Sequence, residues 1–347
     1  MINYSKYIIN THFSIIEALK ALNNLSDDVL TLFVVNEDNK MVGTLTDGDI
    51  RRKLIEGISI TESVTKVMHL NFSYISQDEN NTVSLFRLFK KNGITLLPML
   101  DENHQIVKIF NLKKYSSILP IDAVLMAGGK GERLRPLTEN RPKPLLKIGD
   151  KSIIDYNVDR LISYGIDHIS VTVNYLKEQI EDHFKDSREG VTINCVREPS
   201  YLGTIGSIKF VENIYNDTIL LMNSDLFTNI NYEDFYLHFI NNEADMSVAA
   251  VPYSVNVPYG IFELNGHDIQ GIKEKPSYNY YANAGIYLIK KKHLELIPDE
   301  TFFNATDFIE LLISKGHKVI RFPLTGYWID IGKHEDYKKA NELVKHL

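Results

Sequence analysis

A strand, a glycine-rich loop and a cationic segment follow one another in Val124-Leu-Met-Ala-Gly-Gly-Lys-Gly-Glu-Arg-Leu-Arg-Pro-Leu-Thr-Glu-Asn-Arg-Pro-Lys-Pro-Leu-Leu146. The glycines Gly128, Gly129 and Gly131 lack a Cβ, so backbone N–H groups can approach a phosphate or a base edge closely there. Five cations lie within 14 positions of this stretch: Lys130, Arg133, Arg135, Arg141 and Lys143. Because clustered cations beside a glycine loop suit a triphosphate, the stretch predicts a phosphate-binding loop.

Two common phosphate-binding motifs do not account for this loop. A P-loop needs Gly-x-x-x-x-Gly-Lys-Ser/Thr, and the sequence contains no such string. A dinucleotide fingerprint needs a third glycine where this chain has Leu134. An isolated Gly-Gly-x-Gly would indicate an ordinary turn with a solvated basic flank, but the length of the whole string favours a functional loop.

Strand-like and helix-like apolar patterns alternate after Ile121. The strand-like runs lie at 123–127, 169–173, 219–222 and 246–251, and a helical face is formed by Ile154, Val158, Leu161 and Ile162. Such alternation predicts an α/β, Rossmann-like fold with a mostly parallel sheet and helices on both faces. The ligand site of such a sheet lies beyond the carboxyl ends of its strands. We expect this domain to span residues 119–347 and to end in a helix near 335–347.

The first third of the chain contains a weak internal repeat. The segments 31–45 and 96–110 both indicate a strand, a turn and a strand, with Val42 and Val107 in matching places, and a helical pattern precedes each. A helix–strand–strand unit of this size cannot cover its own apolar face, so the two copies are expected to pack on each other. Residues 1–118 are therefore predicted to form an α+β domain, and 112–120 a linker.

Composition and charge exclude several classes of protein. The 347 residues carry a net charge of −7, which argues against nucleic-acid binding, since that needs a basic face. Cys195 is the sole cysteine, so neither an intramolecular disulfide nor a multi-thiolate metal site is expected, and the 11 histidines show no metal-ligand spacing. The apolar runs are far shorter than the ~20 residues of a spanning helix. Residues 1–20 lack the features of a signal peptide, so we expect a cytoplasmic protein with no membrane partner.

The glycine-rich string resembles the signature of the sugar-1-phosphate nucleotidyltransferases. Further landmarks of that family follow in order, namely Glu198–Gly206, Asn223–Asp225, Tyr259–Gly260, Glu274–Pro276, Asn283–Tyr287 and Trp328–Gly332. The resemblance implies an enzyme that joins a nucleoside triphosphate to a sugar 1-phosphate and releases pyrophosphate. A phosphate monoester has a second pKa of about 6, so the attacking oxygen is already anionic and needs no general base. Positioning and charge neutralisation should carry the catalysis.

The resemblance also implies roles for individual residues. Arg133 and Lys143 would be catalytic, and Asp225 and Asp330 would hold Mg²⁺. The nucleotide would contact Ala127, Gly128, Gly129, Gly131, Glu198, Gly203 and Thr204. The sugar phosphate would contact Gly260, Glu274, Lys275 and Asn283. Ordinary structural explanations stand beside these roles, such as a strand-end turn for Asp225 or a solvated pair for Glu274 and Lys275.

Residues 1–118 resemble a pair of cystathionine-β-synthase (CBS) domains, on the strength of Met41-Val-Gly-Thr-Leu-Thr-Asp-Gly-Asp-Ile50. In that family Thr46 would approach a phosphate, and Asp49 the ribose, of an adenine nucleotide. In the second copy, Gly43, Thr46 and Asp49 are replaced by Lys108, Asn111 and Lys114. One regulatory nucleotide site, or none, is therefore expected. The alternative is a module that only dimerises the enzyme, and we expect a homo-oligomer.

The base and the sugar are predicted from shorter signals. Leu202-Gly-Thr-Ile-Gly206 is closer to the guanylyltransferase loop than to the thymidylyltransferase loop, which favours GTP. The domain order is similar to that of CBS-fused guanylyltransferases of bacterial surface-glycan pathways. A hexose or hexosamine 1-phosphate is therefore expected, with glucosamine 1-phosphate favoured. One alternative is the same reaction with UTP, dTTP or CTP. Another is a non-catalytic nucleotide sensor, although a sensor would not need both Asp225 and Asp330.

Overall fold

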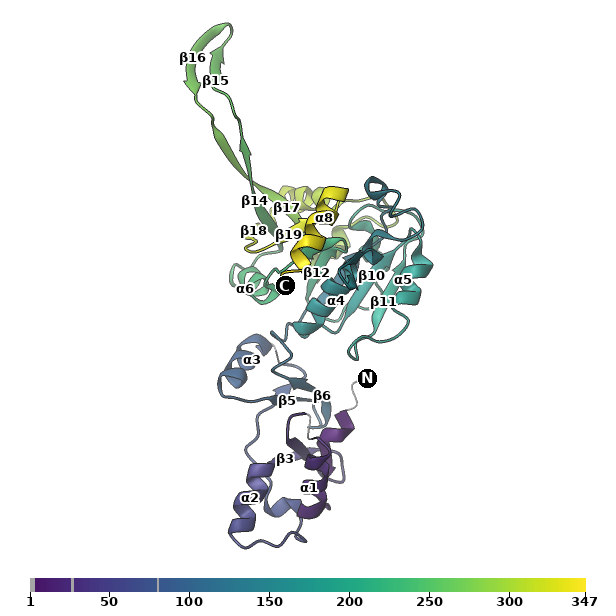
Figure 1. The fold of residues 1–347 in the computed structure, drawn as a ribbon, viewed down its shortest axis with the longest axis vertical. Helices are drawn as coiled ribbons and strands as arrows, with labels where there is room; N and C mark the ends of the chain where they lie inside the picture. Colours follow the sequence, from purple (N-terminus) through teal and green to yellow (C-terminus); the bar gives the residue numbers. More distant parts are fainter. Residues whose placement is uncertain (1–3, 26–27, 80) are drawn as a thin grey trace. The chain divides into compact units, whose positions relative to one another are not determined.

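The computed structural model describes residues 4–25, 28–79 and 81–347, and the chain divides into two units (Figure 1). Unit 1 runs to Pro120 and includes residues 162–165, and unit 2 comprises Ile121–Leu161 and Ile166–Leu347. No helix among the described residues is both long and apolar enough to span a bilayer.

Unit 1 is built from two copies of one strand arrangement. Its elements are η1 (Tyr4–Tyr7), β1 (Ile8–Asn10), α1 (Ile15–Asn23), β2 (Thr31–Val35), β3 (Met41–Thr46), α2 (Asp47–Ile55), η2 (Val64–Lys66), β4 (Ile75–Ser76), α3 (Thr82–Lys91), β5 (Leu96–Leu100) and β6 (Ile106–Asn111). β1 pairs in parallel with β2, which pairs antiparallel with β3, and β4, β5 and β6 repeat this pattern. β3 and β6 occupy matching places in the two copies, as the sequence repeat predicts.

The two copies share a core. Leu96, Leu100 and Ile109 of the second copy lie in one buried cluster with Ile15, Leu32 and other apolar residues of the first. Neither three-stranded sheet is large enough to bury its apolar face without the other. The expected packing of one copy on the other is therefore observed.

Unit 2 contains a seven-stranded sheet. Its strands are β7 (Asp122–Met126), β10 (Ile169–Val173), β11 (Ile193–Arg197), β12 (Thr218–Asn223), β14 (Met246–Asn256), β17 (Ser277–Lys290) and β18 (Val319–Pro323). They lie in the order β11-β10-β7-β12-β17-β14-β18, and β17 alone runs antiparallel to both its neighbours. The predicted mostly parallel sheet is confirmed. The helices are α4 (Ile153–Ser163), α5 (Lys177–His183), α6 (Tyr232–Asn241), α7 (Ala305–Ser314) and α8 (His334–Val344).

Local chemistry explains where these elements form. Every residue of β10 is buried, and its run of Ile, Val and Thr suits a strand covered on both faces. α6 begins where the Asn231 side chain accepts hydrogen bonds from the N–H groups of Glu233 and Asp234, at 3.0 and 3.2 Å. Strand propensity and helix capping depend on neighbouring residues in the sequence, so they define these elements independently of where the fold places them.

Three parallel strands end at one edge of the sheet. Met126 of β7 is in register with Thr172 of β10 and Asn223 of β12, so the segments that follow these strands converge. The glycine-rich loop follows β7, with η3 (Glu132–Leu134) and η4 (Lys143–Leu145), then the hairpin β8 (Lys147–Ile148) and β9 (Lys151–Ser152). Beyond β12, β13 (Leu226–Thr228) pairs antiparallel with β19 (Trp328–Asp330). This pairing brings a C-terminal segment to the same edge.

A two-stranded ribbon projects from the sheet of unit 2 (Figure 1). Up to Ala250, β14 pairs with both β17 and β18. From Val251 to Asn256, β17 is its only partner among the described residues. β15 (Ile261–Asn265) and β16 (Asp268–Lys273) pair with each other further out. We call residues 251–282 the arm.

Candidate active site

A cavity of about 660 Å³ opens at the carboxyl edge of β7 and β12. Every residue predicted to bind the nucleotide or the metal, and both predicted catalytic cations, line it: Ala127, Gly128, Gly129, Gly131, Arg133, Lys143, Glu198, Gly203, Thr204, Asp225 and Asp330. They come from five separate segments of the chain. The fold therefore gathers into one pocket the residues that the sequence presents far apart.

The three glycines of the loop have different structural reasons for lacking a side chain. A Cβ on Gly128 would lie 2.6 Å from a carboxylate oxygen of Glu198, and one on Gly131, where φ is +62°, would lie 3.1 Å from Lys143. A Cβ on Gly129 would meet nothing within 4 Å. Gly128 and Gly131 therefore let the loop close against Glu198 and Lys143. Gly129 faces open space, where its backbone is accessible to a phosphate.

Two aspartates and a lysine meet at the pocket. β13 pairs with β19 so that Leu226 lies opposite Asp330, and the N–H of Ile331 donates to the carbonyl of Asp225 at 3.2 Å. The Lys143 ammonium donates to Oδ2 of Asp225 and lies 3.9 Å from Oδ1 of Asp330. Backbone pairing thus fixes the two carboxylates beside each other, although 105 positions separate them in the sequence.

The charges of this group fit a bound cation. Burial raises the pKa of Asp330, and the neighbouring Asp225 raises it further, while Lys143 and Arg133 act in the opposite direction. Oδ1 of Asp225 is buried, and no hydrogen-bond donor among the described residues reaches it. Hard divalent cations bind carboxylate oxygens, so this donor set suits Mg²⁺. The residues present therefore fit the metal that the sequence predicts.

Arg133 approaches the same group from the glycine loop. A Cβ on Gly332 would lie 3.4 to 3.5 Å from its guanidinium atoms, so the guanidinium lies against this glycine just after β19. Its charge lowers the pKa of Asp330. Arg133 and Lys143 thus present two cations to one pocket, an arrangement that suits a polyphosphate.

Glu198, the residue after β11, adds a carboxylate to the lining of the pocket. Only 4% of the residue is exposed. Burial raises the pKa of Glu198, and a backbone hydrogen bond from Leu202 offsets this only in part. Its Oε2 is buried, and the described residues supply it with no hydrogen-bond partner. A buried acceptor of this kind is costly unless a ligand pairs with it.

Gly203 and Thr204 have structural duties as well as places in the pocket. Gly203 has φ +78°, and a Cβ there would lie 2.6 Å from the carbonyl oxygen of Phe303. The Thr204 hydroxyl accepts a hydrogen bond of 2.8 Å from the N–H of Ala305, the first residue of α7. The loop that carries both residues is therefore tied to the start of α7.

We expect Gly203→Ala to destabilise unit 2 by at least about 2 kcal/mol, because it adds left-handed strain and a steric clash. Gly316→Ala is a matched control, since Gly316 has φ +77° but nothing within 4 Å of a Cβ. Thermal unfolding should show a decrease in midpoint of roughly 4–8 °C for Gly203→Ala and a smaller one for the control. Equal decreases would show that the contact with Phe303 is unimportant.

The four residues predicted to bind the sugar phosphate do not line the pocket. Gly260, Glu274 and Lys275 lie on the arm, where a Cβ on Gly260 would be 2.9 Å from the Glu274 carboxylate. Asn283 lies at the base of the arm, where its side chain accepts from the N–H of Gly285 and donates to the Tyr287 hydroxyl. The cause is the pairing of β14 with β17, which continues without a register shift from Ala250 to Asn256 and extends away from the sheet.

Several lining residues were not predicted. Asn174 and Asn223 end or follow the parallel strands β10 and β12, and Ser224 donates a hydrogen bond to the carbonyl of Met126. Asn174 and Asn223 could have been predicted, because polar residues at the carboxyl ends of parallel strands commonly face the ligand site. Tyr201, on the pocket rim, carried no such signal.

In unit 1, Thr46 and Asp49 form the N-terminal cap of α2. The N–H of Asp49 donates to the Thr46 hydroxyl, and both the N–H and the hydroxyl of Thr46 donate to the Asp49 carboxylate. Arg52 pairs with the other oxygen of that carboxylate at 2.6 Å. This capping box explains both residue types without a ligand. Gly43 is likewise explained, since a Cβ there would lie 2.9 Å from the sulfur of Met68.

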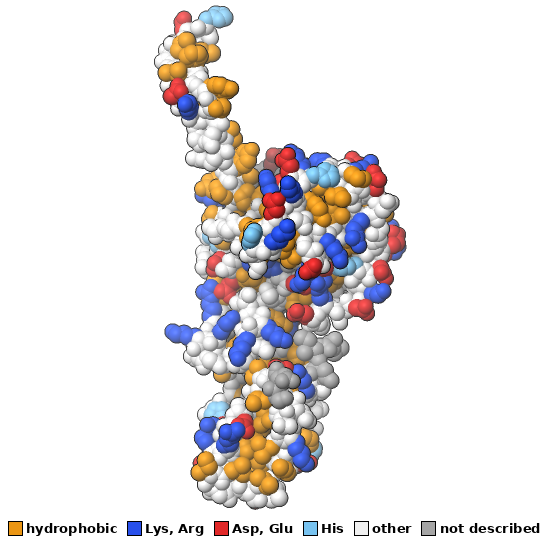
Figure 2. Space-filling model, viewed as in Figure 1, with side chains coloured by type: hydrophobic (Ala, Val, Ile, Leu, Met, Phe, Trp, Pro, Cys, Tyr) orange, Lys and Arg blue, Asp and Glu red, His pale blue; other side chains and the backbone are white. Residues whose placement is uncertain are grey.

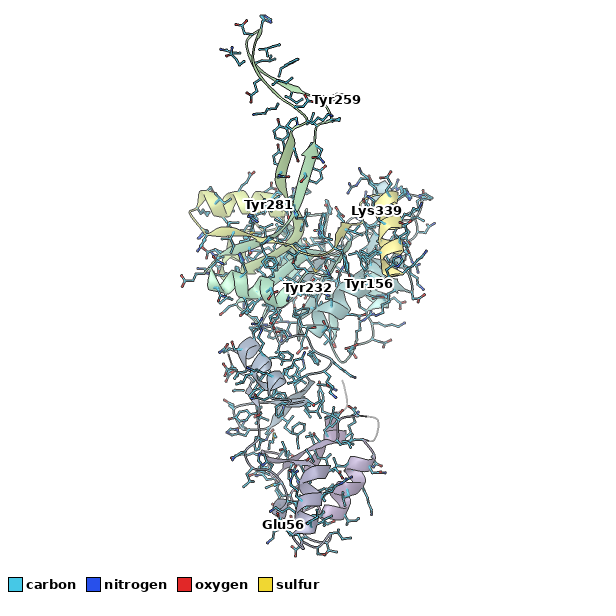
Figure 3. The ribbon with its side chains drawn as sticks, turned by 60° about the vertical axis from the view of Figure 1, so that its left-hand side comes forward. Glu56, Tyr156, Tyr232, Tyr259, Tyr281 and Lys339 are labelled. Atoms are coloured by element: carbon cyan, nitrogen blue, oxygen red, sulfur yellow. The ribbon has the colours of Figure 1, made fainter. Side chains whose placement is uncertain are left out.

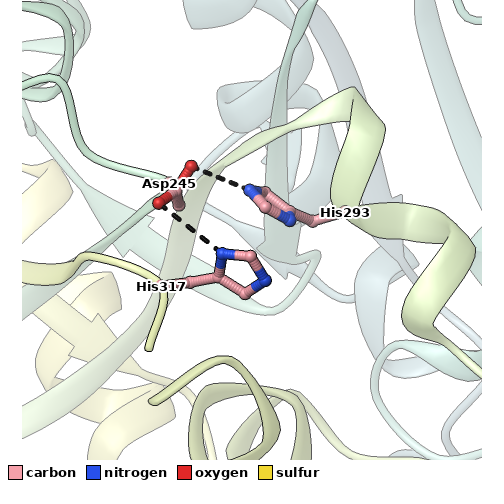
Figure 4. A group of neighbouring side chains, drawn as sticks. All are labelled: Asp245, His293 and His317. Carbon is pink, nitrogen blue, oxygen red and sulfur yellow. Dashed lines mark hydrogen bonds and ion pairs between the residues drawn. The ribbon is translucent and has the colours of Figure 1, made fainter. Parts of the chain in front are cut away.

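A second charged group lies apart from the pocket, just before β14 (Figure 4). His293 Nε2 lies 2.8 Å from Oδ1 of Asp245, and His317 Nδ1 lies 3.9 Å from Oδ2. Their ligand atoms are close enough to surround a metal ion, which no spacing in the sequence indicated. However, Lys290 and Lys292 also pair with the same carboxylate, at 3.3 and 3.6 Å. These ammonium groups disfavour a further cation and make this a structural ion-pair network.

The network predicts a loss of stability in acid. Burial raises the pKa of Asp245, but its hydrogen bonds with His293, the N–H of Lys318 and Lys290 outweigh burial and hold the pKa below its ordinary value. A carboxyl with a lowered folded-state pKa stabilises the fold above its unfolded pKa of about 3.9, and this stabilisation is lost as pH falls through the folded pKa. We expect the contribution to be about 1 kcal/mol, because water screens the exposed lysines.

Asp245→Asn should therefore lower the unfolding midpoint at pH 7, and its difference from the wild type should shrink below about pH 4. Asp150→Asn, in an exposed turn, serves as the control and should change the midpoint at neither pH. A difference between Asp245→Asn and wild type that is independent of pH would contradict the electrostatic explanation.

The family is now defined. The model of the nucleotidyl transferase family matches residues 122–346, well over half of the chain, and the model of the CBS domain matches residues 5–56. The chain therefore belongs to the nucleotidyl transferase family and carries a CBS domain in unit 1.

Individual relatives share about a third or less of their residues with this chain in the matched region. The chain is 34% identical over 232 residues to the bifunctional protein GlmU of Methanocaldococcus jannaschii, covering 65% of this chain and 54% of that protein. It is 29% identical to the D-glycero-alpha-D-manno-heptose 1-phosphate guanylyltransferase of Aneurinibacillus thermoaerophilus, covering 65% and 99%. Among solved structures, HddC from Yersinia pseudotuberculosis matches with a TM-score of 0.50 and 27% identity, covering 65% and 99%. The chain spans only 54% to 62% of the length of two curated relatives that it matches.

Proposed function

We propose that this chain transfers the guanylyl group of GTP to a hexose or hexosamine 1-phosphate, with glucosamine 1-phosphate favoured, and releases pyrophosphate. The observation that carries the proposal is the meeting of Lys143, Asp225 and Asp330 beside the glycine loop. A pocket for nucleotide binding alone would not need two adjacent carboxylates. Together with two cations they form a site that can hold both a metal and a polyphosphate.

The reaction follows from the charges in the pocket. A phosphate oxygen of the sugar 1-phosphate attacks the α-phosphorus of the nucleotide, the bond from that phosphorus to the bridging oxygen breaks, and pyrophosphate leaves with the electron pair. Arg133 and Lys143 neutralise the charge that develops on the phosphoryl oxygens. Asp225 holds the Lys143 ammonium in place. A Mg²⁺ ion held by Asp225 and Asp330 would supply further charge neutralisation.

Glu198 supports guanine as the base. Guanine offers two adjacent donors, N1–H and N2–H, on its pairing edge, and a carboxylate can accept both at once. Uracil and thymine offer one donor, N3–H, on that edge. Oε2 of Glu198 is buried and lacks a partner among the described residues, so it can accept one of these donors. The guanylyltransferase named among the relatives supports the same base.

At unit 1 the proposal is a single adenine-nucleotide site at Thr46 and Asp49. The capping box competes with this role, since it already uses the Asp49 carboxylate. Binding of ADP or ATP to the wild-type chain and not to Asp49→Asn, measured by equilibrium dialysis, would support a regulatory site. Equal binding would place the nucleotide at another site, such as the pocket of unit 2, and no binding would favour the alternative of a module that only dimerises the enzyme.

The enzymatic proposal is tested by pyrophosphate release with Mg²⁺. The four triphosphates GTP, UTP, dTTP and CTP are each combined with glucose, mannose, galactose and glucosamine 1-phosphates, with Asp225→Ala as the inactive control. We expect release with GTP and one sugar phosphate, and none from the control. No release from any pair, by a folded chain that still binds nucleotide, would favour the sensor function instead.

A further inference from the structure

The arm carries exposed large apolar side chains at a higher density per residue than the rest of the described chain. Of the 25 large hydrophobic side chains exposed among the described residues, eleven lie on its 32 residues, including Tyr259, Phe262, Leu264 and Ile272. Figure 2 shows hydrophobic side chains along the ribbon, and Figure 3 shows Tyr259 far out on the ribbon and Tyr281 where the ribbon leaves the rest of unit 2. A two-stranded ribbon is marginal in water, and apolar patches of this extent mark an interaction surface.

The arm also carries the predicted sugar-phosphate residues. Gly260 and Glu274 lie together near the point where β15 and β16 begin their pairing, and Lys275 is the next residue. The pocket is lined only by segments from 126–144, 174, 198–204, 223–225 and 330. The nucleotide wall and the metal group are therefore present, whereas the expected sugar-phosphate wall is missing from the same pocket.

The paired backbone of the arm extends away from the sheet of its own chain. Six consecutive pairs, from Val251 with Ala282 to Asn256 with Ser277, follow one another without a register shift. Such a ladder holds Gly260 and Glu274 roughly 20 Å beyond the edge of the sheet, at about 3.4 Å a residue. The two paired strands therefore carry Gly260 and Glu274 away from the residues that line the pocket.

The rim of the pocket carries exposed aromatic side chains that a partner could contact. Tyr201 lines the pocket, and its ring contacts that of Phe302 edge-to-face at 5.8 Å, with both residues more than half exposed. The arm tip has charges of both signs, among them Glu263, Asp268 and Lys273, so its net charge does not oppose association. An aromatic arm and an aromatic rim on one chain are complementary surfaces that two copies can exchange around a two-fold axis.

Resting on the proposed function, we propose that the arm docks on a second copy of this chain and completes that copy's active site with Glu274 and Lys275. The arm's exposed aromatic and aliphatic face covers the Tyr201 and Phe302 rim of the partner. Lys275 then supplies the positive charge for the sugar's phosphate, and Glu274 accepts hydrogen bonds from its hydroxyls. Each dimer holds two active sites, and each site is made from two chains.

The test uses mixed dimers of two inactive variants. A chain with Asp225→Ala and a chain with Glu274→Ala and Lys275→Ala are co-expressed with different affinity tags, and the mixed dimer is isolated through both tags. In trans, one of the two sites has an intact pocket and an intact partner arm, so the mixed dimer should show about half the wild-type rate. An inactive mixed dimer, or no mixed dimer at all, overturns the proposal.

A reciprocal dimer provides the control. The wild-type chain is paired with a chain that carries all three substitutions. Exchange between chains predicts that this dimer is inactive, because the one intact pocket receives the defective arm. A rate near half of wild type would show that each arm serves its own chain and would overturn the proposal.

A cross-linking measurement separates this inference from the proposed reaction. In a Cys195→Ser background, a chain with Lys275→Cys is mixed with a chain with Lys130→Cys, which places a thiol at the pocket. A short thiol cross-linker should give a covalent dimer of the two different chains, whether or not the wild-type chain releases pyrophosphate. Failure to form that dimer contradicts the arm's docking, while failure of pyrophosphate release alone contradicts only the reaction.

Discussion

Lys143→Ala is expected to lower kcat by about 10²–10³, or roughly 2.7–4 kcal/mol of transition-state stabilisation. Lys143 is 8% exposed, and its ammonium contacts Asp225 and lies near Asp330. Its loss would leave two adjacent carboxylates without their nearest cation and remove a positive charge from the developing phosphoryl charge. The effect should fall mainly on kcat, measured by pyrophosphate release under saturating substrates, because an electrostatic contact that strengthens in the transition state changes kcat.

Lys147→Ala is the matched control, because Lys147 follows in the same segment but is exposed and does not line the pocket. It should change kcat less than twofold. Circular dichroism and thermal unfolding of both variants distinguish lost catalysis from lost folding. A Lys143→Ala chain that is folded and as active as wild type would remove this residue from the mechanism.

Glu198→Gln is expected to lower kcat/KM for GTP by roughly 10–100-fold, since a hydrogen bond to a charged group contributes about 1.5–3 kcal/mol. The substitution keeps the shape of the side chain but turns one of its two acceptors into a donor. Two donors on guanine would then face one acceptor and one donor. UTP and CTP, which do not present the same two-donor edge, should be affected much less, so the preference for GTP should narrow.

Glu212→Gln, at an exposed position outside the pocket, controls for the change in charge. It should leave the ratio of rates for the four triphosphates unchanged. If Glu198→Gln lowers the rate with all four triphosphates equally, the carboxylate supports the loop through Gly128 and does not read the base.

Much of the pocket could be predicted from the sequence because many of its residues lie in short, recognisable segments. The glycine loop, Glu198 and Asp225 each sit in a local pattern at the end of an apolar strand, and a parallel sheet brings such ends together. The contact between Lys143 and Asp225, 82 positions apart, depends on the packing of the loop against β13 and left no local trace. The Asp245 network, drawn from three distant segments, was missed for the same reason.

The arm shows where a sequence pattern stops being informative. A strand with one buried face alternates apolar and polar residues, and that alternation marks where the strand meets the core. On the arm nearly every side chain is exposed, so Tyr253, Tyr278 and Tyr280 carry no such alternation. The motifs containing Gly260 and Glu274 were recognisable, but their place relative to the pocket was not. The mixed-dimer rates test whether they serve their own chain or a second copy.

In the proposed reaction the α-phosphorus of the nucleotide is transferred to a sugar phosphate. The most direct measurement follows a radiolabel in the α-phosphate of GTP during incubation with Mg²⁺ and glucosamine 1-phosphate. We expect the label to move into a nucleotide-activated sugar, in equal amount with released pyrophosphate. Label that accumulates as GMP while the sugar phosphate is unchanged would instead reveal a hydrolase and rule out nucleotidyl transfer.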